Sequence, residues 1–216
     1  MPETFVDSPL LTPRFASAFE LATEVHAAQV RKSTKIPYLA HIMAVTALVL
    51  EAGGDEDCAI GALLHDTVED CDDGVAMGDR IRAEYGHHVF SIVSGCSDTV
   101  ATPGQPKPAW RPRKEAHLRH LEAEQDLAVL LVSACDKLHN GRAIVAELVA
   151  GSGQSVWSRF TVGRQDQLWY YGSLAGLYRE RSATVPGGQM LERVATEFSS
   201  VVAQMGESAD SSERTQ

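Results

Sequence analysis

Residues 63–70 of this chain read LLHDTVED, so four groups able to bind a metal or move a proton directly follow two core-type leucines. Neutral imidazole and carboxylate groups are ligands of Mn²⁺, Fe²⁺ and Zn²⁺. The three carboxylates repel one another unless a cation lies close to them. An isolated His-Asp pair is more often a solvated helix end. The additional Glu and Asp favour a bound metal as the explanation of this octet.

The spacing within the octet restricts how its groups can share a site. Adjacent helix residues point about 100° apart, so His65 and Asp66 reach one ion only near a helix end or in a crease between helices. Glu69 follows His65 by four residues, and Asp70 follows Asp66 by four. Each pair therefore shares one face if the helix continues through the octet.

Two further segments place polar groups in apolar surroundings. His41 is the polar residue of the first turn of an otherwise apolar helix, YLAHIMAV. Asp136 follows an apolar run in the segment SACDKLHNGR, and Asn140 lies one turn later on the same face. A buried charge needs a partner, which for Asp136 is a metal, an arginine or a water network. His41 alone could equally be a core histidine bonded to a backbone carbonyl.

Composition limits the classes of partner. The 216 residues are 44% hydrophobic and carry a formal net charge of −10, which fits one globular domain. A nucleic-acid binder is expected to present a basic surface, and this chain is acidic. No apolar run reaches the roughly 18 residues of a membrane span, and residues 1–12 lack the regions of a secretory signal. We expect a cytoplasmic protein without nucleic-acid or membrane partners. The sequence does not indicate its oligomeric state.

Apolar residues recur every three or four positions along most of the chain, which predicts an all-α fold. Glycine and proline separate the helical segments, most clearly in the proline-rich loop at 102–112. We expect an N-terminal extension at 1–12, one domain at 13–205 and a disordered tail at 206–216. The expected helices cover residues 13–32, 38–52, 55–66, 77–85, 87–94, 113–122, 126–150, 156–181 and 189–205.

Three blocks of this chain, taken in order, resemble the HD superfamily of metal-dependent phosphohydrolases. Within that superfamily they look like the hydrolase branch of the RelA/SpoT family, in particular its small single-domain alarmone hydrolases. The likeness covers roughly residues 15–178. The matching blocks are Arg31-Lys32…Pro37-Tyr38…His41, His65-Asp66…Glu69-Asp70 and Asp136-Lys137-Leu138…Asn140…Arg142.

The resemblance implies an orthogonal multi-helix bundle with one Mn²⁺ in its central crease. It implies that Glu69 and Asp70 hold and activate the attacking water. The bound metal would lower the pKa of that water and polarise a phosphoryl oxygen. The implied metal ligands are His41, His65, Asp66 and Asp136.

The resemblance also implies a small anionic nucleotide as substrate. The reaction would remove pyrophosphate from the 3′ position of guanosine tetraphosphate or pentaphosphate. Asn140 would contact the substrate near the ribose, while Arg31 and Lys32 would meet the guanine base and the phosphates. The cations expected to offset the substrate charge are Arg31, Lys32, Lys35, Lys137 and Arg142.

Departures from the family pattern leave the substrate open. Ile42 stands where the family commonly has proline, Gly141 replaces a bulky residue, and Ala143 replaces a polar one. We expect Gly141 to loosen the helix beside Asn140. Two alternatives stay open. The first is hydrolysis of another nucleotide, such as a different 3′-phosphorylated purine or a nicotinamide dinucleotide phosphate; the second is a nucleotide sensor without catalysis.

Three further groups of residues receive a structural interpretation. His139 is expected to point away from Asp136 by helical geometry and to serve structure or surface. The aromatic segment at 168–174, LWYYGSL, is expected to be core, with one tyrosine able to line the site. The cations that follow the proline-rich loop are expected to be mainly solvated, with a weaker prospect of phosphate contact; they are Arg111, Arg113 and Lys114.

Overall fold

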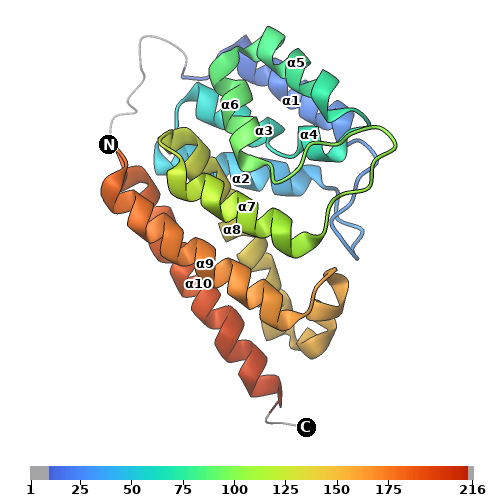
Figure 1. Ribbon diagram of the computed structural model, residues 1–216, viewed down its shortest axis with the longest axis vertical. Coiled ribbons are helices and arrows are strands. Elements are labelled where there is room, and N and C mark those ends of the chain that lie inside the picture. Colours follow the sequence, from blue (N-terminus) through green and yellow to red (C-terminus); the bar gives the residue numbers. More distant parts are fainter. Residues whose placement is uncertain (1–9, 214–216) are drawn as a thin grey trace, which may run out of the picture.

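Helices form the framework of the protein in the computed structural model, which describes residues 10–213 without the side chains of 152–154 and 208–213. No strand occurs among residues 10–213, and the predicted all-α class is confirmed (Figure 1). The α-helices are α1 (Pro13–Val25), α2 (Leu39–Ala52), α3 (Glu56–Leu64), α4 (Thr67–Asp70), α5 (Gly74–Tyr85), α6 (His87–Cys96), α7 (Trp110–Ala123), α8 (Leu127–Glu147), α9 (Arg164–Thr184) and α10 (Gln189–Glu213). A π turn (Leu148–Ser152) and a 3₁₀ turn (Gly153–Arg159) join α8 to α9.

Side-chain caps set several helix starts. The Asp55 carboxylate accepts a hydrogen bond from the Cys58 amide at 2.9 Å, and Asp126 accepts one from the Ala128 amide at 2.9 Å. Thr12 caps α1, whose first residue, Pro13, has no amide hydrogen to satisfy. These caps satisfy amide donors that a helix leaves without internal partners.

The helices divide between two hydrophobic clusters. One cluster is drawn mainly from α1, α3, α5 and α6, and the other mainly from α7, α8, α9 and α10. In Figure 1, α9 and α10 lie side by side, and α10 also packs against α8. Helix α2, like α3 and α6, contributes to both clusters, since Ile42 belongs to the first while Val45 and Val49 belong to the second. His41, next to Ile42, therefore lies where the clusters meet.

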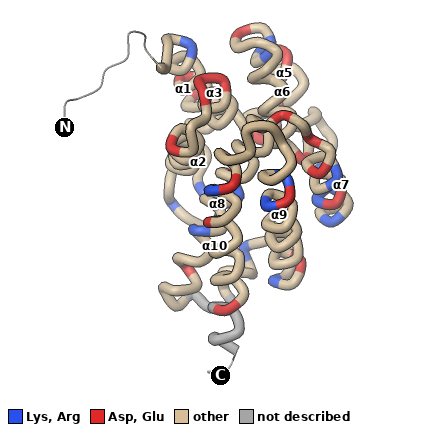
Figure 2. Tube along the Cα trace, turned by 90° about the vertical axis from the view of Figure 1, so that its left-hand side faces the viewer, with Lys and Arg blue, Asp and Glu red and all other residues tan. Residues whose placement is uncertain are grey.

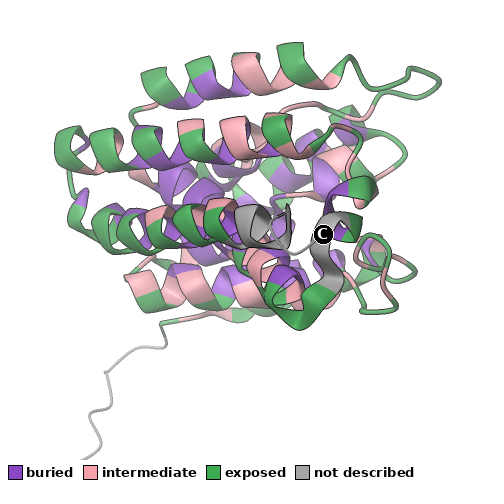
Figure 3. Cartoon of the chain, turned by 90° about the horizontal axis from the view of Figure 1, so that it is seen from below, coloured by how far each residue is buried: buried purple, intermediate pink, exposed green. Residues whose placement is uncertain are grey.

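Helix α8 is the most enclosed of the long helices. Every residue from Ala128 to Asp136 is buried, so Asp136 is a carboxylate at the end of a core segment. Figure 3 shows buried residues on the inner faces of the helices and exposed residues on the outer faces. The sequence argument that Asp136 needs a partner thus applies to a residue that is 6% exposed.

Acidic and basic side chains are interspersed over the helices in the view of Figure 2. No helix in the described part of the chain is long and apolar enough to cross a membrane. Because charges of both signs are interspersed over the helices, cations that could bind an anionic ligand must gather at one place.

Several helix boundaries differ from the expected ones, three of them by more than a few residues. Helix α1 ends at Val25 instead of near Lys32, because residues 29–38 turn back in a bridge in which the Arg31 amide bonds the Ile36 carbonyl at 2.8 Å. Helix α9 begins at Arg164, after Gly163, so the single helix expected over 156–181 is wrong at its start. Helix α10 continues to Glu213, so residues 206–213, expected to be disordered, are helical.

Candidate active site

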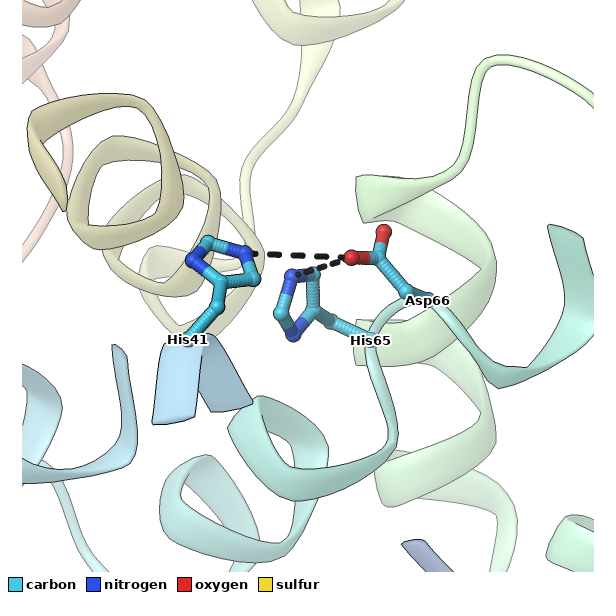
Figure 4. A group of neighbouring side chains, drawn as sticks. All are labelled: His41, His65 and Asp66. Atoms are coloured by element: carbon cyan, nitrogen blue, oxygen red, sulfur yellow. Dashed lines mark ion pairs between the residues drawn. The ribbon is translucent and has the colours of Figure 1, made fainter. Parts of the chain in front are cut away.

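The break between α3 and α4 presents two of the expected metal ligands. Helix α3 ends at Leu64, and His65 and Asp66 stand between the two helices. His41 meets them from the first turn of α2 (Figure 4). One oxygen of Asp66, Oδ2, lies 3.0 Å from Nε2 of His65 and 3.8 Å from Nε2 of His41. These three residues form a compact group with the donor types and spacing of a metal site.

Asp136 reaches the same point from α8. Its Oδ1 atom lies 3.1 Å from Nε2 of His41 and 3.8 Å from Nε2 of His65. The four residues that the sequence brought forward as ligands therefore converge, although they come from α2, the α3–α4 break and α8.

The hydrogen bonding of the two imidazoles fits a metal. Nδ1 of His65 lies 2.8 Å from the Ala62 carbonyl, which fixes the proton on Nδ1 and leaves a lone pair on Nε2. Both Nε2 atoms are buried and make no hydrogen bond within the described structure. Orphaned polar atoms in a core are uncommon and costly. Two imidazole nitrogens and two carboxylates around one point form a donor set that suits a divalent transition metal.

Neighbouring side chains keep both carboxylates ionised. Burial opposes ionisation of Asp136, but the Lys137 ammonium 2.5 Å away and the imidazoles hold the pKa of that carboxyl well below its usual range. Asn140 donates to Oδ1 of Asp136 at 2.6 Å. Likewise, burial raises the pKa of Asp66, whereas the close His65 imidazole outweighs burial and lowers that pKa. The hydroxyl of Tyr38 donates a hydrogen bond to Asp66.

His139 belongs to this centre, contrary to the sequence interpretation. Its Nδ1 lies 2.8 Å from Nδ1 of His41, with the ring centroids 4.9 Å apart. The sequence interpretation did not foresee this contact with His41, although residues three apart on a helix are neighbours on its surface and His139 follows Asp136 by three. That i, i+3 spacing was the available signal.

The Glu69 and Asp70 carboxylates lie on α4 and contact the neighbouring loops. Glu69 accepts hydrogen bonds from the Asp98 amide at 2.9 Å and from the Lys107 ammonium at 3.3 Å. Burial, followed by the charges of Asp98 and Asp66, raises the pKa of Glu69. Asp70 is exposed and accepts a hydrogen bond from the Gln29 amide at 2.8 Å. Because α3 and α4 are separate, the shared faces expected from a continuous helix do not form.

A cavity of about 380 Å³ adjoins the metal-ligand group. Tyr38 and Lys137 line it and also hydrogen-bond Asp66 and Asp136, so they join the cavity to the centre. The cationic lining residues are Arg31, Lys32, Lys114, Lys137 and Arg159. The aromatic ones are Tyr38, Trp110, Phe160, Tyr170 and Tyr171. The locally positive lining suits an anionic ligand despite the acidic chain.

The cavity contains most, but not all, of the predicted substrate contacts. Arg31 donates to the Asn140 side chain at 3.0 Å, and Lys32 lies 5.8 Å from the centre of the Phe160 ring. Arg142 does not line the cavity. Its guanidinium pairs with Glu197 of α10, with Nε 3.1 Å from Oε1.

The cations after the proline-rich loop separate into three environments. Lys114 lines the cavity and pairs with Asp98 at 2.5 Å, and Arg113 pairs with the same carboxylate. Arg111 stacks 3.3 Å from the centre of the Trp169 ring, outside the cavity lining. Two tyrosines of the aromatic segment, Tyr170 and Tyr171, line the cavity, where one was expected.

Sequence reasoning missed Trp110, Arg159 and Gln167 in the cavity lining. Gln167 is only 6% exposed. It and Arg159 belong to the segment assigned to one continuous helix, so their placement depends on the turn that the sequence did not reveal. Trp110 was assigned to the proline-rich loop, but it is the first residue of α7.

The HD domain family model matches residues 18–168, and the chain belongs to this family. Its relatives include a probable guanosine-3′,5′-bis(diphosphate) 3′-pyrophosphohydrolase of Synechocystis, 33% identical over 129 residues. A guanosine-3′,5′-bis(diphosphate) 3′-pyrophosphohydrolase of Haemophilus influenzae is 30% identical over 129 residues. The two alignments cover 60% and 57% of this chain and only 16% and 18% of those longer proteins.

A solved structure supports the fold. It is reported as a metazoan orthologue of SpoT that hydrolyses ppGpp, and it matches with a TM-score of 0.64 at 22% identity. The match covers 88% of this chain and 96% of that one. The predicted resemblance to HD-domain proteins of the RelA/SpoT type, with a helical bundle around a His-Asp centre, is confirmed.

Proposed function

We propose that this chain is a Mn²⁺-dependent phosphohydrolase that releases the 3′-diphosphate of guanosine 3′,5′-bis(diphosphate). The observation that carries the proposal is the pair of buried, unbonded Nε2 atoms of His41 and His65, which face Asp66 and Asp136 beside a cationic cavity. The choice of substrate rests on similar proteins that are named as pyrophosphohydrolases of this nucleotide.

The proposed ligands are His41, His65, Asp66 and Asp136. A bound divalent ion would supply Lewis-acid chemistry and a bound water of lowered pKa. Tyr38 and Asn140 hold the two carboxylates by hydrogen bonds, so each keeps its direction toward the ion. Lys137 balances the charge of Asp136 and also faces the cavity, where it is available to a phosphate.

Glu69 is proposed as the base that accepts the proton of the attacking water at its carboxylate. Burial raises its pKa, which brings the carboxylate nearer to the strength a general base needs at neutral pH. Asp70 is proposed to orient the water. Arg31, Lys32 and Asn140 are proposed to bind the nucleotide, since their side chains line the cavity beside the centre.

The decisive experiment joins metal analysis to a cleavage assay on the purified chain. We expect about one Mn²⁺ per chain and release of pyrophosphate from guanosine 3′,5′-bis(diphosphate). The Asp136→Ala variant should lose both the metal and the activity. A folded, metal-loaded chain that releases no pyrophosphate contradicts the proposed reaction. Parallel assays with a 3′-phosphorylated adenosine nucleotide and a nicotinamide dinucleotide phosphate separate the alternative substrates.

A further inference from the structure

His41 has a hydrogen-bond partner that differs in kind from that of His65. Nδ1 of His65 faces the Ala62 carbonyl, which can only accept, so one tautomer is fixed. Nδ1 of His41 lies 2.8 Å from Nδ1 of His139, a nitrogen that can donate or accept. The His41 imidazole is thus held by His139, which can act either as hydrogen-bond donor or as hydrogen-bond acceptor.

A bound metal selects between those roles. A neutral imidazole that offers the Nε2 lone pair must carry its proton on Nδ1. The Nδ1–H of His41 then donates to Nδ1 of His139, which in turn must carry its own proton on Nε2. When no ion is bound, the reversed pair is available, with His139 donating to Nδ1 of His41 and the proton of His41 on Nε2, which lies 3.1 Å from Oδ1 of Asp136.

The position of His139 reinforces this arrangement. His139 follows Asp136 by three residues on α8, so one helix carries both a proposed ligand and the group that contacts a second one. Its side chain reaches across to α2, where His41 is a fully buried residue of the first turn. Any tilt of the His41 ring would move Nε2 away from the other ligands, and this contact opposes it.

We infer that His139 is a positioning residue that holds the His41 ring in the tautomer and orientation that binds the metal. The inference rests on the proposed ligand role of His41. It assigns to His139 a function in metal affinity, separate from any contact with the nucleotide.

Two isosteric substitutions test the inference. Asn at position 139 places an amide oxygen where Nδ1 of histidine stands, while Leu has a similar shape without an acceptor. We expect His139→Leu to weaken Mn²⁺ binding by roughly ten- to one-hundred-fold, as loss of a second partner of a metal ligand does. His139→Asn should stay within a few-fold of the wild type. Mn²⁺ affinity is measured by competition with a chelator, and His120→Leu on the exposed face of α7 controls for the exchange of histidine for leucine.

His41→Ala distinguishes failure of the inference from failure of the proposed metal site. If His41→Ala keeps wild-type Mn²⁺ affinity, the ligand set itself is wrong. If His41→Ala loses the metal but His139→Leu binds it as the wild type does, the positioning role alone is overturned. Equal weakening by Asn and Leu also overturns it, because the acceptor would then be immaterial.

A measurement on the unmutated chain guards against variants that misfold. With diamagnetic Zn²⁺ in the site, long-range ¹H–¹⁵N correlation spectra report which ring nitrogen carries the proton. We expect the proton on Nδ1 of His41 and on Nε2 of His139. The opposite assignment for His139 contradicts the inference without any substitution.

Discussion

Two arginines that look alike in the sequence have different roles in the structure. Arg31 and Arg142 both stand in blocks that match the family pattern, and both were expected to meet the substrate. The fold turns Arg31 into the cavity, against Asn140, while Arg142 pairs with Glu197 on α10. Whether an arginine can meet the substrate therefore depends more on the face from which its side chain projects than on its chemical type.

The first prediction compares these two arginines. We expect Arg31→Ala to raise KM for guanosine 3′,5′-bis(diphosphate) by about ten-fold or more, since a charge-assisted contact contributes roughly 1.5–3 kcal/mol. Arg142→Ala should leave KM within about two-fold, because its partner is an exposed carboxylate and such pairs contribute little. Steady-state kinetics at saturating Mn²⁺ measures both. A larger KM effect at Arg142 than at Arg31 would contradict the assignment.

The second prediction concerns Glu69. Glu69→Gln keeps an oxygen that can accept from the Asp98 amide but cannot take a proton from water. We expect kcat to fall by about 10²–10⁴-fold, the usual contribution of a general base, while bound Mn²⁺ stays at the wild-type level. Unchanged turnover would contradict the role of general base and leave Glu69 with a structural role, the hydrogen bond to the Asp98 amide.

At the scale of elements, the contact of α8 with α10 depends on Gly141. A Cβ atom added at Gly141 would lie 2.9 Å from Cγ1 of Val201 and 3.5 Å from Cε1 of Tyr171. The glycine was expected to loosen the helix beside Asn140. Its place in the packing explains the glycine differently: the absence of a side chain at Gly141 lets α10 approach α8 closely. The surrounding helices restrain the segment that a glycine alone would weaken.

The third prediction measures this close approach by a double-mutant cycle. Gly141→Ala gains about 1 kcal/mol of helix propensity, yet overpacking against stiff, β-branched Val201 costs roughly 1–3 kcal/mol. We expect Gly141→Ala to lower the free energy of unfolding in the wild-type background and to lower it less, or raise it, in the Val201→Ala background. Urea denaturation of the four proteins gives the coupling. Additive effects would show that the two helices do not meet through this glycine.

At the scale of the whole molecule, His117 is a buried titratable group that links stability to pH. Its side chain on α7 is 3% exposed, and Nδ1 has no hydrogen-bond partner in the described structure. Burial, followed by the charges of Lys137 and Lys114, lowers the pKa of His117 to about 3. The imidazole is thus neutral in the folded protein at any pH where the protein is expected to work.

The fourth prediction uses the sign of that shift. Below about pH 6.5, His117 binds a proton in the unfolded chain but stays unprotonated in the folded one, so the free energy of unfolding decreases as the pH falls toward 3. The slope from this group approaches roughly 1.4 kcal/mol per pH unit. Between pH 7.5 and 5.0, the wild type should therefore lose about 2 kcal/mol more than His117→Leu. Urea unfolding of the metal-free proteins at both pH values measures the difference, and parallel losses would contradict a buried neutral imidazole.

The sequence by itself predicted the helical class from apolar periodicity, which is a local signal. It predicted the four proposed ligands through the resemblance of three blocks to the HD superfamily, and buried charged or imidazole groups, which cost free energy without a partner, agree with that set. The early end of α1, the break at His65 and the contact of His139 with His41 came only from the tertiary structure. Each depends on hydrogen bonds or packing between segments far apart in the chain, and a pattern read along one helix does not contain the neighbour across from it.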